Sequence, residues 1–288
     1  MKSSWGNGMI AGLSILLAAV TVFALAFGLK WSRERDLGIP TPASDEGQTP
    51  RPMTGGSSWI SADLYQKGRY VFERNCQICH GRWGDGRGEM ALGMKPRPRN
   101  FTTGLFKFRS TPSGFLPTDL DLERTIRRGI ANSSMPAFGL LSDPELKSVV
   151  AYLKTFSPNW SQPERHSAPI PAPAEPEWLR SSGPDYVGAK GHRDAGARLY
   201  QTHCAVCHGL EADGKSEVAR SLEDVWGQPC PPADLRTPGL KSGSDPADLH
   251  RVLSTGLDGS PMPSFAESLT VGQRWEVVAY LLWLRSGH

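Results

Sequence analysis

The most apolar stretch of the chain lies near its N-terminus. The 21 positions from Met9 to Leu29 carry no charged side chain. A helix rises about 1.5 Å per residue, so this stretch is long enough to cross a bilayer core about 30 Å thick. Trp5 and Trp31 flank it, and aromatic rings of this kind commonly lie at membrane interfaces. The pattern predicts a single membrane-spanning helix within residues 1–36.

A cleaved signal peptide is the alternative interpretation of this segment. Ala24-Leu25-Ala26 is a small-x-small sequence of the kind found at signal cleavage sites. Basic residues are more frequent after the apolar stretch, from Lys30 onward, than before it, and the positive-inside rule then disfavours export of the C-terminal bulk of the chain. The stretch is long for a signal peptide, so a retained anchor is the favoured prediction. The attachment chemistry described below decides the orientation.

Beyond residue 60 the apolar positions follow the spacing of amphipathic helices, and the pattern occurs twice, about 128 residues apart. Short helices that stop at glycine are predicted over 121–129 and 248–256. Apolar C-terminal helices are predicted around 149–153 and 277–281. The chain therefore carries one helical domain type twice.

Each copy opens with a helix that carries a glycine and an aromatic residue in the same register. Ser61 is a candidate N-cap for the first of these helices. Gly68 and Gly196 lie eight residues before a cysteine, and Phe72 and Tyr200 lie four residues before it. Glycine permits the close approach of a second backbone, and the aromatic ring lies one turn further along the same face.

Proline-rich segments separate the copies. The chain has 24 Pro and 31 Gly, which predicts many turns, little sheet and a mainly α fold. Residues 37–59 are predicted to be a flexible tether and residues 157–189 a proline-rich linker. Two domains are therefore expected, at 60–156 and 190–288, each large enough to hold its own core.

The strongest chemical signal is a C-x-x-C-H motif in each copy: Cys76-Gln77-Ile78-Cys79-His80 and Cys204-Ala205-Val206-Cys207-His208. This is the attachment motif of c-type haem, in which two thiols add to one porphyrin and the adjacent histidine reaches the iron. A structural zinc site would need further ligands, and only one other cysteine remains. We therefore expect two covalently bound haem c groups, attached at Cys76, Cys79, Cys204 and Cys207, with iron bound by His80 and His208.

With these motifs the chain resembles a di-haem cytochrome c built from two class I cytochrome c domains in tandem behind a membrane anchor. The resemblance covers roughly residues 60–156 and 190–286. It implies a small helical wrap around each haem and a methionine from a late loop as sixth iron ligand. It also implies that a loop, here 95–101 and 231–235, passes below each haem and offers a carbonyl to the histidine N–H.

Two Met-Pro-x-Phe units match this expectation. Met135 and Met262 each lie six residues after the glycine that ends a predicted short helix, and 55 and 54 residues beyond the haem histidines. A methionine is more often core filler, but its soft thioether pairs with histidine in cytochromes c. Met90 and Met94 stand in a loop without a counterpart and are assigned to core or surface. We expect Met135 and Met262 to be the sixth ligands.

The remaining histidines and the fifth cysteine have no matching partner in the other copy. None of these histidines is expected to bind iron: His166, His192, His203, His250 and His288. Cys230 is expected to be a buried or unreactive thiol, with an intermolecular disulfide as the alternative.

Iron held by histidine and methionine has no open position for a substrate, so the expected function is electron transfer rather than catalysis. The leading interpretation is a membrane-anchored carrier of single electrons between respiratory partners, or the electron-transfer subunit of an oxidase or reductase complex. The architecture also resembles the di-haem subunit of certain haem–copper oxidases. The alternative is a di-haem enzyme, such as a cytochrome c peroxidase or a thiosulfate-oxidising cytochrome.

Location and partners follow from the cofactor. Haem is attached to these motifs outside the cytoplasmic membrane, so the two domains are expected on the periplasmic side of a bacterial cytoplasmic membrane. The N-terminal helix would contact the lipid bilayer. Redox proteins, including subunits of a respiratory complex, are the expected partners, and no nucleic acid is expected.

Charge differs between the two copies. Residues 60–160 carry 15 Lys+Arg against 9 Asp+Glu, whereas residues 186–288 carry 10 against 12. One interpretation is that these charges are merely solvated and partly offset by haem propionates. The other is that the first domain docks an acidic partner while the second exchanges electrons with a less charge-dependent one. The excess includes loop residues after the first haem motif: Arg82, Arg87, Lys95, Arg97, Arg99, Lys107 and Arg109.

Overall fold

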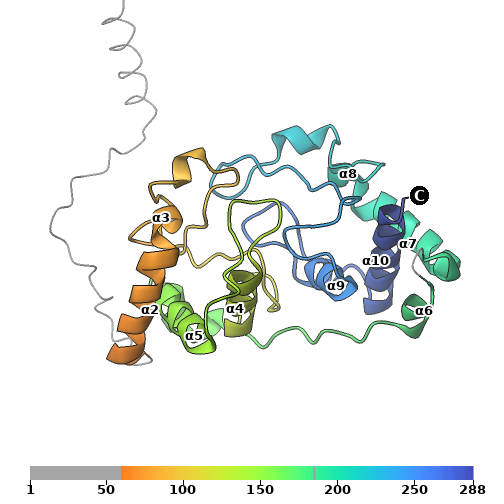
Figure 1. Cartoon of the computed structure of the whole chain (residues 1–288). Coiled ribbons are helices and arrows are strands. Elements are labelled where there is room, and N and C mark those ends of the chain that lie inside the picture. Colours follow the sequence, from red (N-terminus) through yellow and green to blue (C-terminus); the bar gives the residue numbers. More distant parts are fainter. Residues whose placement is uncertain (1–59, 184–185, 288) are drawn as a thin grey trace, which may run out of the picture. The chain divides into compact units, whose positions relative to one another are not determined.

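The structure, a computed structural model, describes residues 60–183 and 186–287, and this part of the chain is built from helices and loops (Figure 1). The only β-type pairing in this part of the chain is an isolated antiparallel bridge between Glu223 and Pro229. The prediction of a mainly helical protein is therefore confirmed for the described residues. The predicted anchor, within 1–36, and the predicted tether, 37–59, lie outside them. No helix in the described part is long and apolar enough to span a membrane.

The helices follow one another in two similar series. The first series comprises α2 (Ala62–Asn75), α3 (Gln77–His80), η1 (Ala91–Gly93), α4 (Asp119–Arg128), and α5 (Asp143–Lys154). Between the series lie η2 (Pro158–Ser161), η3 (Pro163–Arg165), α6 (Glu177–Arg180), and η4 (Val187–Ala189). The second series comprises α7 (Lys190–His203), α8 (Ala205–His208), η5 (Val218–Ser221), α9 (Pro246–Thr255), and α10 (Val271–Arg285).

In the first domain, α2 packs directly on α5. Ser61 caps α2 as predicted, because its side-chain oxygen accepts from the N–H of Leu64 over 3.2 Å. A Cβ atom at Gly68 would lie 2.1 Å from the carbonyl oxygen of Ser148, so only glycine allows the two helices to approach this closely. Phe72 is buried one turn further and its ring lies 5.4 Å from that of Tyr152.

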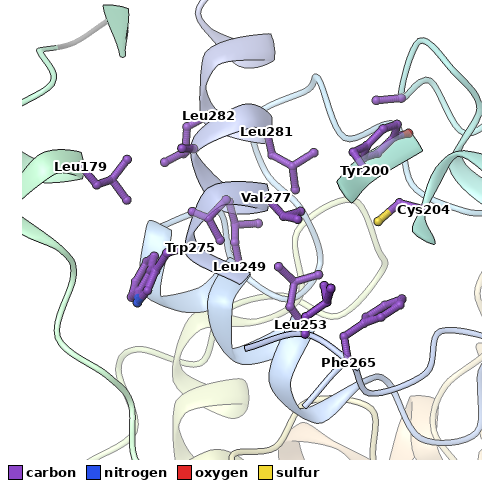
Figure 2. Close-up of a cluster of buried hydrophobic side chains, with 14 of the residues drawn as sticks. Leu179, Tyr200, Cys204, Leu249, Leu253, Phe265, Trp275, Val277, Leu281 and Leu282 are labelled. Carbon is purple, nitrogen blue, oxygen red and sulfur yellow. The ribbon is translucent and has the colours of Figure 1, made fainter. Parts of the chain in front are cut away.

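The second domain repeats this crossing with α7 and α10. A Cβ atom at Gly196 would lie 1.9 Å from the carbonyl oxygen of Glu276. Tyr200 is completely buried, and its hydroxyl donates to the carbonyl of Gly209 over 2.6 Å. Figure 2 shows this core, in which Val277 and Leu281 of α10 face Leu249 and Leu253 of α9. Both predicted glycine contacts are thus present.

The short helices α4 and α9 end at glycines with left-handed backbones. Gly129 has φ of 63° and Gly256 has φ of 66°. A Cβ atom at either glycine would lie 2.6 Å from a backbone atom of the following loop, that of Ala137 or Ser264. Glycine therefore both stops the helix and lets the loop fold back against it.

The proline-rich linker is anchored in both domains. Trp160 is buried in the first hydrophobic cluster and Leu179 in the second. The N–H of Ile170 donates to the carbonyl of Ser110 over 2.7 Å. The linker therefore runs along the protein surface and contributes side chains to each core.

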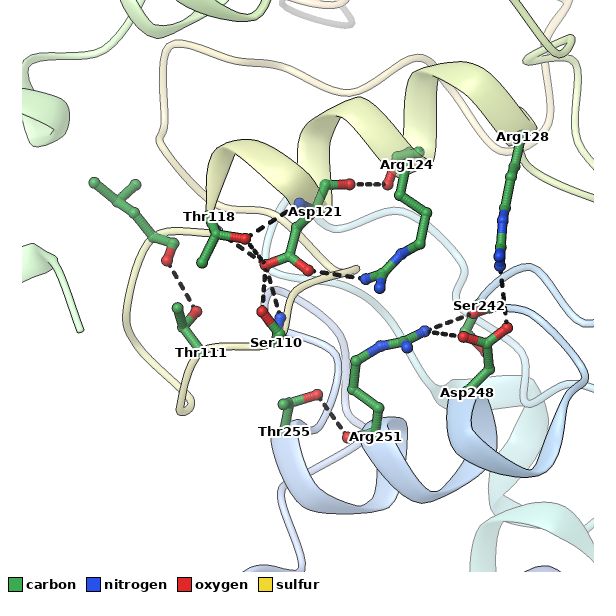
Figure 3. Close-up of polar contacts among 12 residues, drawn as sticks. Ser110, Thr111, Thr118, Asp121, Arg124, Arg128, Ser242, Asp248, Arg251 and Thr255 are labelled. Atoms are coloured by element: carbon green, nitrogen blue, oxygen red, sulfur yellow. Dashed lines mark hydrogen bonds and ion pairs between the residues drawn. The ribbon is translucent and has the colours of Figure 1, made fainter. Parts of the chain in front are cut away.

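Polar contacts join the two domains, which belong to the same compact unit of the chain. Figure 3 shows Arg128 of α4 beside Asp248 of α9, at 3.5 Å. Each of these helices also carries its own acid–base pair three residues apart, Asp121 with Arg124 on α4 and Asp248 with Arg251 on α9. Equivalent faces of the two repeated domains thus meet across this boundary.

Candidate functional site

Each C-x-x-C-H motif forms one tight helical turn directly after a longer helix. The N–H of Cys76 donates to the carbonyl of Phe72, in the last turn of α2, over 2.8 Å. The N–H of His80 then donates to the carbonyl of Cys76 over 2.9 Å, and His208 does the same to Cys204 over 2.9 Å. Two thiols and one imidazole are thereby gathered within a single turn in each domain.

Burial controls the chemistry of the first thiol in each motif. Burial, with a smaller effect of neighbouring Cys79, raises the pKa of Cys76 to about 12. Burial, with a smaller effect of Cys207, raises the pKa of Cys204 to about 11. These groups are therefore neutral thiols at neutral pH before haem is attached, and attachment replaces the ionisable proton with a thioether.

A backbone carbonyl orients each histidine, as the resemblance implied. Nδ1 of His80 donates to the carbonyl of Arg99 over 3.0 Å, and Nδ1 of His208 donates to the carbonyl of Ala233 over 3.2 Å. Burial lowers the pKa of both histidines, which favours the neutral ring. With Nδ1 held by a carbonyl, Nε2 is the nitrogen left to bind iron, and the ring orientation is set.

The position that follows the histidine-holding carbonyl by two residues carries a different side chain in each domain. Phe101 stacks on the ring of His80, with centroids 4.4 Å apart and planes 19° from parallel. The N–H of Phe101 donates to the carbonyl of Gly84 over 2.6 Å, and the N–H of Leu235 donates to the carbonyl of Ala212 over 2.8 Å. These matching bonds show that Phe101 and Leu235 occupy equivalent positions. The second domain therefore has an aliphatic side chain where the first has an aromatic one.

The two methionines lie in loops with the same hydrogen bonds. The carbonyl of Met135 accepts from the N–H of Ile130 over 3.1 Å, and that of Met262 accepts from Leu257 over 3.0 Å. Both side chains are half-buried and pack against the core of their own domain. Met90, by contrast, is 53% exposed. Iron ligation by Met135 and Met262 remains a prediction. Their matched loops predict that both methionines play the same role, each in its own domain.

A second repeated motif escaped the sequence analysis. Each histidine is followed by Gly-x-x-x-Asp-Gly, and the last glycine, Gly86 or Gly214, donates its N–H to the histidine carbonyl over 2.9 Å. Both glycines have positive φ, 77° and 73°. The aspartate of each motif, Asp85 or Asp213, accepts with its side-chain Oδ1 the backbone N–H of the residue two positions later. The Gly-x-x-x-Asp-Gly motif recurs after 128 residues, as the haem motifs do, so a comparison of the two copies could have found it.

The other candidate groups lie elsewhere. His250 is buried, its ring lies 4.4 Å from that of Trp275 in a tilted arrangement, and burial is the chief cause that lowers its pKa to about 4. Cys230 is half-buried, and its sulfur lies 3.7 Å from Nζ of Lys107 in the other domain. No cluster of three or more His, Cys, Asp or Glu suited to a metal ion occurs within 60–183 and 186–287.

The residues present fit covalently attached haem. Each turn offers two thiols and an imidazole whose Nδ1 is already occupied by a carbonyl, which is the donor set that c-type attachment requires. Cys76, Cys79 and His80 would hold the group in the first domain. Cys204, Cys207 and His208 would hold it in the second.

Comparison with known proteins agrees with this chemistry. A family model described as cytochrome C oxidase, cbb3-type, subunit III, matches residues 63–153 and 192–281, together more than half of the chain. A chain of the Kuenenia stuttgartiensis reducing HAO-like protein complex Kustc0457/Kustc0458 superposes with a TM-score of 0.70 and 37% sequence identity, covering 76% of this chain and 96% of that one. Each segment matched by the family model contains one C-x-x-C-H turn. The chain belongs to the family of cytochrome c oxidase, cbb3-type, subunit III, whose cytochrome c domains carry covalently bound haem c and transfer electrons.

Proposed function

We propose that the chain binds two haem c groups and passes single electrons between respiratory partners, as the electron-transfer subunit of an oxidase or reductase complex. The observation that carries the proposal is the repetition of one complete binding turn. Both domains combine paired thiols with a histidine held by a backbone carbonyl, at 3.0 Å for His80 and 3.2 Å for His208. When bound, haem supplies a reversible one-electron couple at its iron.

The protein's own residues prepare each site for transfer without bond chemistry. The carbonyls of Arg99 and Ala233 hold the imidazoles in one tautomer, and so limit reorganisation when the charge on iron changes. Met135 and Met262, each packed on a domain core, would fill the sixth position and exclude water or peroxide.

The contact between the two domains supports transfer within the chain. The guanidinium of Arg99, from the loop that holds His80, lies 4.3 Å above the ring of Trp226 in the second domain. Lys107 reaches Cys230, in the loop that precedes Ala233. The loops that support the two histidines therefore meet at the domain boundary, which favours a short route between the haems.

A complex is the proposed setting. The Kuenenia relative is described as part of a protein complex, and its chain is covered almost completely by this one. We place the haem domains on the periplasmic side of a bacterial cytoplasmic membrane, because c-type attachment takes place there, with residues 9–29 as the anchor.

Intact mass and ligand binding test the proposal together. The protein matured in a cytochrome c-producing host should exceed the polypeptide mass by two haems, and full reduction should consume two electrons per chain. Carbon monoxide should bind slowly and incompletely to the reduced protein, because both irons are six-coordinate. Rapid binding to one haem with turnover of peroxide would instead support the di-haem enzyme alternative.

A further inference from the structure

We propose that the first domain docks an acidic redox protein on the face around its haem-attachment turn. This basic face comprises three apolar residues, Ile78, Met90 and Leu92, and four cations, Arg82, Arg87, Lys95 and Arg97. The inference rests on the proposed electron-transfer function and names the partner's chemistry and the place where it binds.

The apolar centre of the face lies directly on the haem turn. Ile78 stands between the two haem cysteines and is 49% exposed, and its carbonyl accepts the N–H of Met90 over 3.0 Å. Met90 is 53% exposed, and Leu92 on η1 is 83% exposed. Exposed apolar side chains that gather beside a haem-attachment turn are typical of a surface that a partner covers.

The four cations lie in the same loop segments, 82–97, as Met90 and Leu92, and they carry charge that can attract a partner. Arg82, Arg87, Lys95 and Arg97 are all exposed. None of them forms an ion pair with a carboxylate in the described part of the chain. The same loop holds two acids. Asp85 is half-buried and accepts the backbone N–H of Arg87, so Glu89 is the one exposed carboxylate among these cations. The face is therefore positive at its rim.

The structure divides the basic excess seen in the sequence into two groups. Three of its seven loop cations are directed at the second domain: Arg99 at Trp226, Lys107 at Cys230, and Arg109 at Asp258. The side chains of these three cations are occupied by contacts at the domain boundary. Of these seven loop cations, the four of the basic face remain available to an external partner.

The second domain has an apolar surface at the equivalent place but a different rim. Val206 stands between its haem cysteines and is 64% exposed, and Leu210 is 73% exposed. Its rim mixes three exposed acids with two exposed bases: Glu211, Glu217, Glu223, Lys215 and Arg220. An acidic partner would therefore be steered to the first domain and not to the second.

Electron exchange with an acidic protein tests the inference on the full, haem-loaded chain. The probe is reduced plant-type ferredoxin, an acidic one-electron donor, mixed with the oxidised protein by stopped flow at ionic strengths of about 0.02 M and 0.5 M, which bracket strong and weak screening. We expect the wild-type second-order rate to fall at least about tenfold across this range. The double variant Lys95→Glu with Arg97→Glu should lose about tenfold at low salt and little at high salt.

The matched control makes the same change in net charge away from the face. Lys147→Glu with Lys241→Glu alters two exposed lysines outside it and should keep most of the wild-type rate. Leu92→Ser, which leaves all charges in place, should also slow the reaction. Equal rates in the face and control variants, or a rate that does not depend on salt, would overturn the docking face.

Two further readouts distinguish an acidic protein partner from a second copy of the chain or a lipid surface. An uncharged quinol should reduce all variants at the wild-type rate, and failure to reduce even the wild type would contradict the electron-transfer function instead. The other two occupants are tested by self-association and by binding to anionic vesicles. If the face variants lose either property of the wild type while the ferredoxin rate stays unchanged, the face serves a second copy of the chain or a lipid surface. The inference would then be wrong.

Discussion

Arg109 of the first domain donates from Nη2 to Oδ1 of Asp258 in the second domain over 2.7 Å. The same nitrogen also donates to the carbonyl of Thr255 over 2.7 Å, and the arginine side chain is completely inaccessible to solvent. Asp258 completes its bonding with the hydroxyl of Ser113 and the N–H of Gly114. Burial lowers the pKa of Arg109, and Asp258 opposes that shift. This ion pair joins segments 149 residues apart in sequence.

Asp258→Ala should therefore destabilise the docked pair of domains. The variant leaves a buried guanidinium without its counter-charge, which typically costs about 3 kcal/mol or more. Denaturant unfolding should show that loss, and small-angle scattering should show an expanded particle if the domains separate to hydrate Arg109. Asp194→Ala, which removes an exposed pair with Lys190 on α7, should cost far less, because solvent screens exposed ion pairs. Similar losses in both variants would contradict the role of the buried pair.

The sequence predicted the parts of this fold that depend on local chemistry. Ser61 caps α2 and Gly129 stops α4, because spacing and backbone geometry decide both features. The resemblance implied only that some carbonyl of loop 95–101 would receive the histidine N–H, and that carbonyl is the one of Arg99. The domain boundary depends instead on which distant surfaces meet. From sequence alone, Arg99 and Arg109 could not be told apart from the exposed cations of the same loops. The packing of the linker residues Trp160 and Leu179 is likewise a tertiary effect.

Replacing Met135 or Met262 with alanine tests the predicted sixth ligands. Each variant should lose about half of the weak absorption band that methionine-bound ferric haem produces, and each should gain one haem that binds carbon monoxide rapidly. The two effects should be separable, because each methionine packs on its own domain core. Met90→Ala is the control and should leave the band unchanged. Retention of the full band in both ligand variants would exclude the assignment.

His250 should make the second domain sensitive to acid. Its folded-state pKa is about 4, below the ordinary value of about 6.5, because burial disfavours the charged ring and nearby Arg274 adds to this. The unfolded chain therefore binds a proton that the folded chain does not. The resulting loss of stability begins as pH falls below about 6.5 and grows until about pH 4.

His250→Phe should flatten that dependence while preserving the ring contact with Trp275. Urea unfolding of both proteins between pH 7.5 and 4.5 provides the measurement. If the variant loses as much stability as the wild type over this range, another group is responsible.

The N-terminal segment gives a prediction about membrane attachment. If residues 9–29 form a retained anchor, the protein should stay in the membrane pellet after alkaline carbonate washing, with its N-terminus near Met1. A mature chain that begins near Phe27 would show instead that the segment is a cleaved signal peptide. Deleting residues 1–36 behind an unrelated cleavable signal should release a soluble protein with the same haem content.

Alanine substitution at two glycines of α7 should have opposite effects. Alanine is favoured over glycine within a helix by about 1 kcal/mol, so Gly191→Ala, where no atom lies within 4 Å of the new Cβ, should stabilise the domain slightly. At Gly196 the new Cβ would lie 1.9 Å from the carbonyl oxygen of Glu276 and 2.5 Å from its carbon. These are backbone atoms of α10, so α7 must move away from it, and overpacking of this kind costs about 1–3 kcal/mol. Denaturant unfolding of the two haem-loaded variants measures the difference. Because both changes add the same methyl group to the same helix, equal shifts would mean that close crossing of α7 and α10 does not require glycine.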